Sequence, residues 1–185
     1  MILLIDMDGV LVDFVGGVIK EYERKTGTVL EYPTEFRFED AWKGVADMDA
    51  INDIMLQKDF FLNLEPMPGA IEACRMMEKM PSIDFHLCTA PKRGSTYCVG
   101  EKWEWIKHYL GQNWTDNFAA IYDKTLVHGD ILLDDHPDQR GRMTPEWVQV
   151  LYDHPYNRDG LASRMPRITW DNWPDMFLQV PLSGD

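Results

Sequence analysis

Short apolar runs alternate with helical patterns along the chain. The first run, residues 2–5, has the length and β-branched content of a buried strand. Further strand candidates follow at 83–88, 119–122, 131–133 and 147–152. Strands separated by helices predict an α/β fold with a doubly wound, mostly parallel sheet.

Apolar residues at helical spacing predict helices between these strands. The patterns start at Phe14, Met48, Pro68, Gly100 and Trp170. The first ends near Gly27, the second extends to about residue 60, and the pattern from Gly100 stops at Gly111, a normal C-terminal cap. In the helix expected over 100–110, the side chains of Trp103, Ile106 and Leu110 should face inward.

The segment between the first two strands predicts an insertion. It contains helical patterns and an irregular, aromatic-rich stretch at 28–46, but no strand candidate. We therefore expect residues 1–15 and 66–185 to form the core of the fold, and residues 16–65 to form a small helical cap inserted after strand 1.

Polar residues stand where the predicted strands end. Asp6 and Asp8 follow the first strand, Thr89 the second, and Asp134 and Asp135 the fourth. If the strand order is 3-2-1-4-5, these ends are neighbours at the edge of the sheet where α/β proteins bind ligands. Each residue alone would pass for an ordinary turn residue, but that interpretation must then hold at every strand end at once.

The set has the chemistry of phosphoryl transfer. Asp6 can act as a nucleophile that forms an aspartyl-phosphate, and Asp8 can act as an acid and base. Lys124 offers a positive charge, although a lysine in this context is more often at the surface. Mg²⁺ prefers oxygen ligands and keeps several waters, so a few protein oxygens would suffice. Asp130 also forms a GDxxxD pattern with Asp134, but we favour a role for it at the start of the strand.

Composition and net charge limit the kinds of partner that the chain is expected to bind. The 185 residues carry a net charge of -13, which disfavours polymeric nucleic acid and anionic membranes. A small anionic substrate would need local positive charge. Three cysteines without a CxxC pair favour a reducing, cytoplasmic setting, and we find neither a membrane-spanning run nor a signal peptide.

The chain resembles a known family at this point. The segments DMDGVLVDF, FFLNLEPMPGA, CTAP, CVGEKWEW, DKTLVHGDILLDD and WDNW are similar to those of the 5'(3')-deoxyribonucleotidases of the haloacid dehalogenase (HAD) superfamily. The resemblance covers nearly the whole chain. It implies a HAD-like fold and a Mg²⁺-dependent phosphatase that acts on the 5' phosphate of deoxyribonucleoside monophosphates, with the 3' and 2' phosphates as further candidate targets.

The resemblance also assigns roles to individual residues. It implies that Asp6 is the nucleophile, Asp8 the acid/base, and that Mg²⁺ is held by Asp6, the Asp8 carbonyl and Asp135, with Asp134 in support. Thr89, Ala90 and Lys124 would hold phosphate, although Ala90 stands where the family pattern has a serine. The implied and candidate pocket residues are Phe14, Phe61, Arg93 and, by composition and region only, Trp42 and Phe38.

Two alternatives remain open on the sequence. One is a phosphatase of the same fold for another small phosphomonoester. The other is a phospho-receiver signalling domain, in which the phosphorylated Asp would follow the third strand and the Lys would come last; here Lys124 precedes the final acid pair. Whether the chain forms a homodimer is also left open.

Overall fold

The computed structural model describes residues 1–178 and contains a six-stranded parallel sheet in the order β3-β2-β1-β4-β5-β6. The strands are β1 Ile2–Ile5, β2 Asp84–Thr89, β3 Phe118–Ala120, β4 Ile131–Asp134, β5 Val148–Tyr152 and β6 Arg167–Ile168. The predicted order of the first five strands is confirmed. The sixth was not predicted, because two residues carry no periodic pattern. Residues 179–185, part of the predicted core range, lie outside the described residues.

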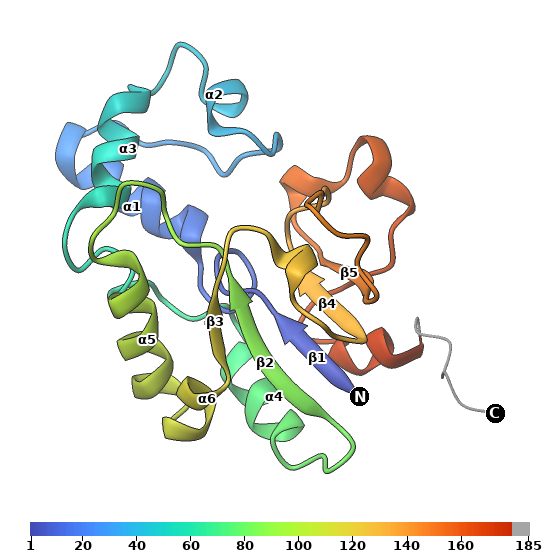
Figure 1. The fold of residues 1–185 in the computed structure, drawn as a ribbon. Coiled ribbons are helices and arrows are strands. Elements are labelled where there is room, and N and C mark those ends of the chain that lie inside the picture. The colour runs from blue at the N-terminus through green and yellow to red at the C-terminus, as the bar shows by residue number, and fades with distance from the viewer. Residues whose placement is uncertain (179–185) are drawn as a thin grey trace.

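Helical segments lie between most of the strands, whereas a loop without a helix joins β4 to β5 (Figure 1). They are α1 Phe14–Thr26, α2 Phe38–Ala41, α3 Met48–Leu56, α4 Ala70–Met77, α5 Cys98–Tyr109 and α6 Gln112–Asp116, with 3-10 turns η1 Lys124–Leu126, η2 Pro155–Asn157, η3 Gly160–Arg164 and η4 Trp173–Leu178. The helix expected over 48–60 ends at Leu56. The chain then turns through Asp59, which has a positive φ of 67°.

The inward face of α5 differs from the prediction. Trp103 is only partly buried and lies under Lys107, whereas Trp105 is fully buried. The buried stripe of α5 consists of Cys98, Glu101, Lys102, Trp105 and Ile106. Two of these residues are charged, so a search for apolar residues alone assigns the wrong face.

The core lies mainly on one face of the sheet. Leu3 and Ile5 of β1 point into the larger apolar cluster, which includes residues of α4 and α5. Leu4 points to the opposite face, where it packs with Trp147 in a smaller cluster. Asp130 directly precedes β4 at the amino ends of the strands, where its Oδ2 accepts a hydrogen bond from the Ile2 amide at 2.6 Å. This contact fits the structural role favoured for Asp130.

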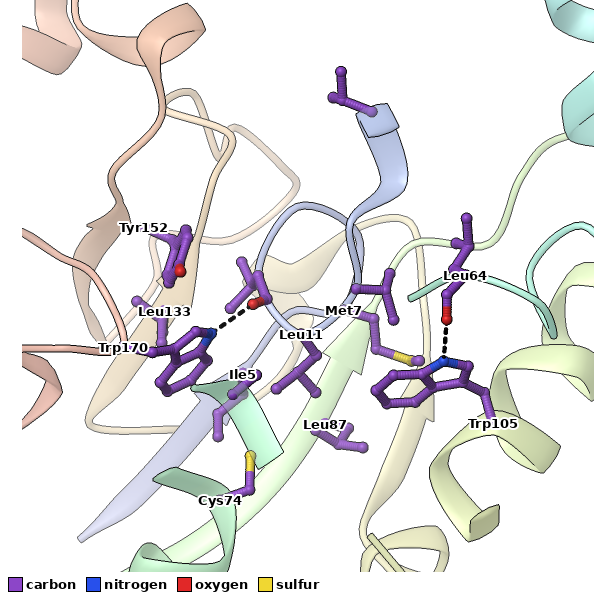
Figure 2. Close-up of a cluster of buried hydrophobic side chains, with 14 of the residues drawn as sticks. Ile5, Met7, Leu11, Leu64, Cys74, Leu87, Trp105, Leu133, Tyr152 and Trp170 are labelled. Carbon is purple, nitrogen blue, oxygen red and sulfur yellow. Dashed lines mark hydrogen bonds between the residues drawn. The ribbon is translucent and has the colours of Figure 1, made fainter. Parts of the chain in front are cut away.

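Two tryptophans fix the loops that border the site. The indole of Trp170 donates to the Val10 carbonyl and that of Trp105 donates to the Leu64 carbonyl, both at 2.8 Å; the two bonds are dashed lines in Figure 2. Because these indoles are buried, each N–H would have no hydrogen-bond acceptor without this carbonyl. The loop after β1 and the segment before α4 are thereby tied to the core.

The chain leaves and re-enters the core at one place. The Asp13 amide donates to the Glu65 carbonyl, and the Met67 amide donates to the Leu11 carbonyl. Between these points, α1 to α3 lie beyond the carboxyl ends of the strands (Figure 1). The three cysteines are buried free thiols. No helix within residues 1–178 has the length and apolarity needed to cross a membrane.

Candidate active site

Parallel pairing brings two aspartates together at the carboxyl ends of the central strands β1 and β4. Ile5 of β1 pairs with Leu133 of β4, so the next residues, Asp6 and Asp134, emerge side by side. The Asp6 amide donates to the Leu133 carbonyl at 2.9 Å. Oxygen atoms of Asp6, Asp134 and Asp135 all lie within 4.8 Å of one another. The predicted convergence of strand ends is therefore present.

Lys124 bridges the first two of these acids. Its Nζ lies 2.8 Å from Asp6 Oδ1 and 2.5 Å from Asp134 Oδ2. Burial alone would lower the pKa of Lys124, but attraction to Asp134 and Asp6 outweighs burial and raises it. The lysine is thus held as a cation inside the site, unlike the surface lysine that its sequence context alone suggests.

Asp8 has its own lysine, which the sequence analysis missed. Lys102 Nζ lies 2.7 Å from Asp8 Oδ2 and also donates to Thr89 Oγ1 at 2.8 Å and the Ala90 carbonyl at 3.2 Å. Burial raises the pKa of Asp8; Lys102 opposes this rise, and repulsion from Asp6 adds to it. The available signal was a charged residue at an inward position of the α5 pattern.

Asp135 has a neutral partner. Tyr156 Oη donates to Asp135 Oδ2 at 2.6 Å, and no Lys or Arg within residues 1–178 forms an ion pair with Asp135. Burial raises the pKa of Asp135 well above its usual range, and repulsion from Asp134 and Asp6 adds to the rise. Tyr156 was not predicted, because it lies in an irregular segment after β5.

The cluster fits a divalent cation. Its donors are carboxylate oxygens, the ligands that Mg²⁺ prefers. Asp8 Oδ1 is buried without a hydrogen-bond partner among the described residues. A cation beside these acids would relieve the repulsion that raises the pKa of Asp135. Asp6, Asp135 and the Asp8 segment could hold it.

A cavity of about 570 Å³ opens in front of the acids. Its size suits a drug-sized or nucleotide-sized molecule. The side toward α1–α3 is largely apolar, although Arg37, Glu39 and Asn52 also line it; its apolar residues are Phe14, Phe36, Phe38, Met48, Ile51 and Met55. Charged and polar residues line the opposite side, among them Lys92 and Tyr122. The cavity therefore has an acidic end, where the carboxylates could hold a cation, and a largely apolar side toward α1–α3.

The predicted pocket residues do not all reach this cavity. Phe14 lines it, and so does Phe38. Phe61 is buried behind Phe14, with ring centroids 6.2 Å apart, and Trp42 is buried against Phe38 at 4.5 Å. Arg93 lies over the ring of Tyr122, 4.2 Å from its centroid, and does not line the cavity itself.

Comparison with known proteins decides the family. The statistical model of the family described as "5' nucleotidase, deoxy (Pyrimidine), cytosolic type C protein" matches residues 1–180. The chain is 33% identical to the human cytosolic-type 5'(3')-deoxyribonucleotidase, over 95% of this chain and 92% of the relative. The chain belongs to the 5'(3')-deoxyribonucleotidase family. It is therefore a phosphoric monoester hydrolase, and the phospho-receiver alternative is excluded.

Other relatives of this deoxyribonucleotidase family member agree. A putative 5'(3')-deoxyribonucleotidase of Bordetella pertussis is 34% identical over 96% of this chain and 95% of its own. The human mitochondrial enzyme is 35% identical over 94% of this chain and 78% of its own. A putative β-phosphoglucomutase structure from Thermotoga maritima has a TM-score of 0.53 at 15% identity, covering 97% of this chain and 99% of that one. A putative haloacid dehalogenase-like hydrolase from Burkholderia xenovorans has a TM-score of 0.50 at 13% identity, covering 96% of each chain. These structures show a HAD-like fold.

Proposed function

We propose that this protein hydrolyses deoxyribonucleoside monophosphates through an aspartyl-phosphate on Asp6, with Mg²⁺ as cofactor. The observation that carries the proposal is the gathering of Asp6, Asp134 and Asp135 within 4.8 Å at one end of the apolar cavity. The names of the matching relatives supply the substrate class.

The reaction divides into two displacements. A carboxylate oxygen of Asp6 attacks phosphorus, the P–O ester bond breaks, and Asp8 gives its proton to the leaving nucleoside oxygen. Asp8 then takes a proton from water as that water attacks the aspartyl-phosphate, which releases phosphate and restores Asp6. Burial raises the pKa of Asp8, which favours the first role because the carboxyl then keeps its proton to a higher pH than a free aspartate does.

The phosphate end requires positive charge. Mg²⁺, held by Asp6, the Asp8 carbonyl and Asp135, would supply charge that stabilises the transferring phosphoryl group. Lys124 adds a fixed cation, and Asp134 holds it in place through the 2.5 Å contact. We assign Thr89 and Ala90 to the same group. Lys102 contacts both residues and would hold the loop that presents them.

The nucleoside end is the apolar side of the cavity. We propose that residues 16–65 form a cap that covers the sugar and base, with Phe14 and Phe38 as its walls. An apolar wall beside the sugar leaves a ribose 2'-hydroxyl without a partner, which costs roughly 1–3 kcal/mol. Deoxyribonucleotides should therefore be preferred, by about a hundredfold at most.

Phosphate release from paired deoxy- and ribonucleoside monophosphates, with Mg²⁺ and after chelation, tests the proposal. We expect activity that is lost with EDTA, restored by Mg²⁺, and abolished in Asp6→Asn. Asp84→Asn, on an exposed carboxylate at the opposite end of β2, is the matched control and should retain activity. Activity that survives in Asp6→Asn would remove the covalent mechanism. Faster cleavage of sugar phosphates than of dUMP or dTMP would favour the alternative substrate class.

A further inference from the structure

Tyr156 lies between the proposed metal carboxylate and the inserted segment. It belongs to η2, its side chain is buried, and it lines the cavity. Its hydroxyl donates to Asp135 Oδ2 at 2.6 Å. This bond occupies one oxygen of the carboxylate and leaves Oδ1 for another ligand.

The turn that carries Tyr156 also forms a hydrogen bond with the backbone of Asp135. Asn157 Nδ2 donates to the carbonyls of Asp135 at 2.8 Å and Tyr152 at 2.9 Å. Asn157 and His154 cap the turn reciprocally through backbone and side-chain bonds. The tyrosine hydroxyl is therefore held at a fixed place relative to the carboxylate that it contacts.

The glycine of the first motif leaves room for this contact. Gly9 has a φ of +73°, and a Cβ built there would lie 2.4 Å from Asp135 Oδ2 and 2.8 Å from Tyr156 Oη. Any side chain at position 9 would collide with both partners of the hydrogen bond. The motif loop and the Tyr156–Asp135 pair are thus fitted to each other.

Aromatic residues of the segment 28–37 hold Tyr156 from the other side. The ring of Tyr32 lies 6.1 Å from that of Tyr156 at 21°, and its hydroxyl lies 3.1 Å from His154 Nδ1. His154 stacks on Tyr156 at 4.5 Å, and its Nε2 donates to the Gly9 carbonyl at 2.6 Å. Phe36 contacts Tyr156 edge-on at 5.8 Å.

We propose that Tyr156 is a positioning residue that couples docking of segment 28–37 on the core to the orientation of the Asp135 carboxylate, and so to cation binding. The proposal rests on the proposed function through the assignment of Asp135 as a metal ligand. When the segment is docked, Tyr32 and Phe36 pack against the Tyr156 ring. The Tyr156 hydroxyl then orients the Asp135 carboxylate so that its free oxygen can bind the cation. The cap then affects the metal site as well as the substrate.

Titration of the protein with Mn²⁺, followed by electron paramagnetic resonance of the free ion, measures the positioning role without using turnover. Partners of metal ligands typically contribute 10–100-fold to metal affinity, and we expect a loss in this range for Tyr156→Phe, which keeps the ring and removes the hydroxyl. Tyr152→Phe is the matched control, because it removes another buried tyrosine hydroxyl that does not contact Asp135. Its Mn²⁺ affinity should equal that of the wild type.

Two outcomes separate failure of this inference from failure of the proposed function. If Asp135→Asn binds Mn²⁺ as tightly as the wild type, or the wild type binds none, the metal assignment in the proposed function is wrong. If Asp135→Asn loses affinity while Tyr156→Phe keeps it, only the role of Tyr156 is refuted.

A separate comparison of variants tests the coupling between segment 28–37 and the cation site. The double variant Tyr32→Phe/Phe36→Leu should weaken Mn²⁺ binding when Tyr156 is present and have little further effect in the Tyr156→Phe background, because residues that act through one another are non-additive. An equal loss in both backgrounds would show that the segment does not act through Tyr156. No loss in either background would show that docking does not affect the cation.

Discussion

Replacing Lys102 by methionine removes the only ammonium partner of Asp8 among the described residues. Lys102 is 1% exposed, and its Nζ contacts Asp8 Oδ2, Thr89 Oγ1 and the Ala90 carbonyl. Methionine fills nearly the same space. The substitution therefore leaves packing largely intact while it removes the charge and three donated hydrogen bonds.

The expected cost follows from burial. Removing one partner of a buried ion pair typically destabilises a protein by about 3–5 kcal/mol. The Asp8 side chain is 27% exposed, so water can solvate part of the orphaned carboxylate, and we take the lower end, about 3 kcal/mol. For a chain of this size about 1 kcal/mol lowers Tm by roughly 2–4 °C, which predicts a drop of roughly 6–12 °C.

Thermal unfolding in EDTA, followed by circular dichroism, measures this effect without a bound cation. Lys107→Met is the matched control on the same helix, because Lys107 is exposed and lies over Trp103; its Tm should change by no more than about 2 °C. Asp8→Asn/Lys102→Met should be more stable than the sum of its single variants predicts, since it removes both charges. A Tm for Lys102→Met equal to that of Lys107→Met would refute the reasoning.

Three further substitutions test other contacts. Glu101→Gln should destabilise the protein by about 1.5–3 kcal/mol in equilibrium urea unfolding, because the Glu101 carboxylate accepts two backbone amides of segment 59–61. Gly9→Ala should cost at least about 1–2 kcal/mol from its positive φ alone, and more from the collision with Asp135; an unchanged Tm would contradict this geometry. Trp42→Phe should lower stability by about 1 kcal/mol, because it removes the indole N–H that donates to the Glu31 carbonyl. It should leave kcat/KM within about twofold, because Trp42 does not line the cavity. A large rise in KM would show that Trp42 contributes to substrate binding after all.

The sequence predicted the part of the site that depends on parallel strands. A buried strand reads as a short apolar run, and its carboxyl end is marked by the first polar residue. Asp6 and Asp134 could therefore be located without any knowledge of packing, and strand order alone then placed them side by side. The six-stranded order confirms this step, with β6 as the one strand in residues 1–178 that was too short to detect.

The rest of the site depends on packing that leaves no periodic signal. Lys102 occupies an inward position of α5, where a pattern search expects an apolar side chain and instead selected Trp103. Tyr156 lies in a turn of three residues after β5. In the segment 28–46 aromatic residues are frequent, and which of them face the cavity is decided by how α2 docks. Phe38 faces the cavity, while Trp42, on the next turn, is buried behind it.

Charge balance links these parts. Four aspartates, Asp6, Asp8, Asp134 and Asp135, surround the site, and the two lysines paired with them supply only two positive charges. With every group ionised, the cluster carries a formal charge of two negative units, which one divalent cation would neutralise. The unbalanced charge falls near Asp135, whose partner is a neutral hydroxyl and whose pKa burial raises well above its usual range. A tyrosine at that place orients the carboxylate without competing for the cation, whereas a third lysine would neutralise the charge that the metal needs.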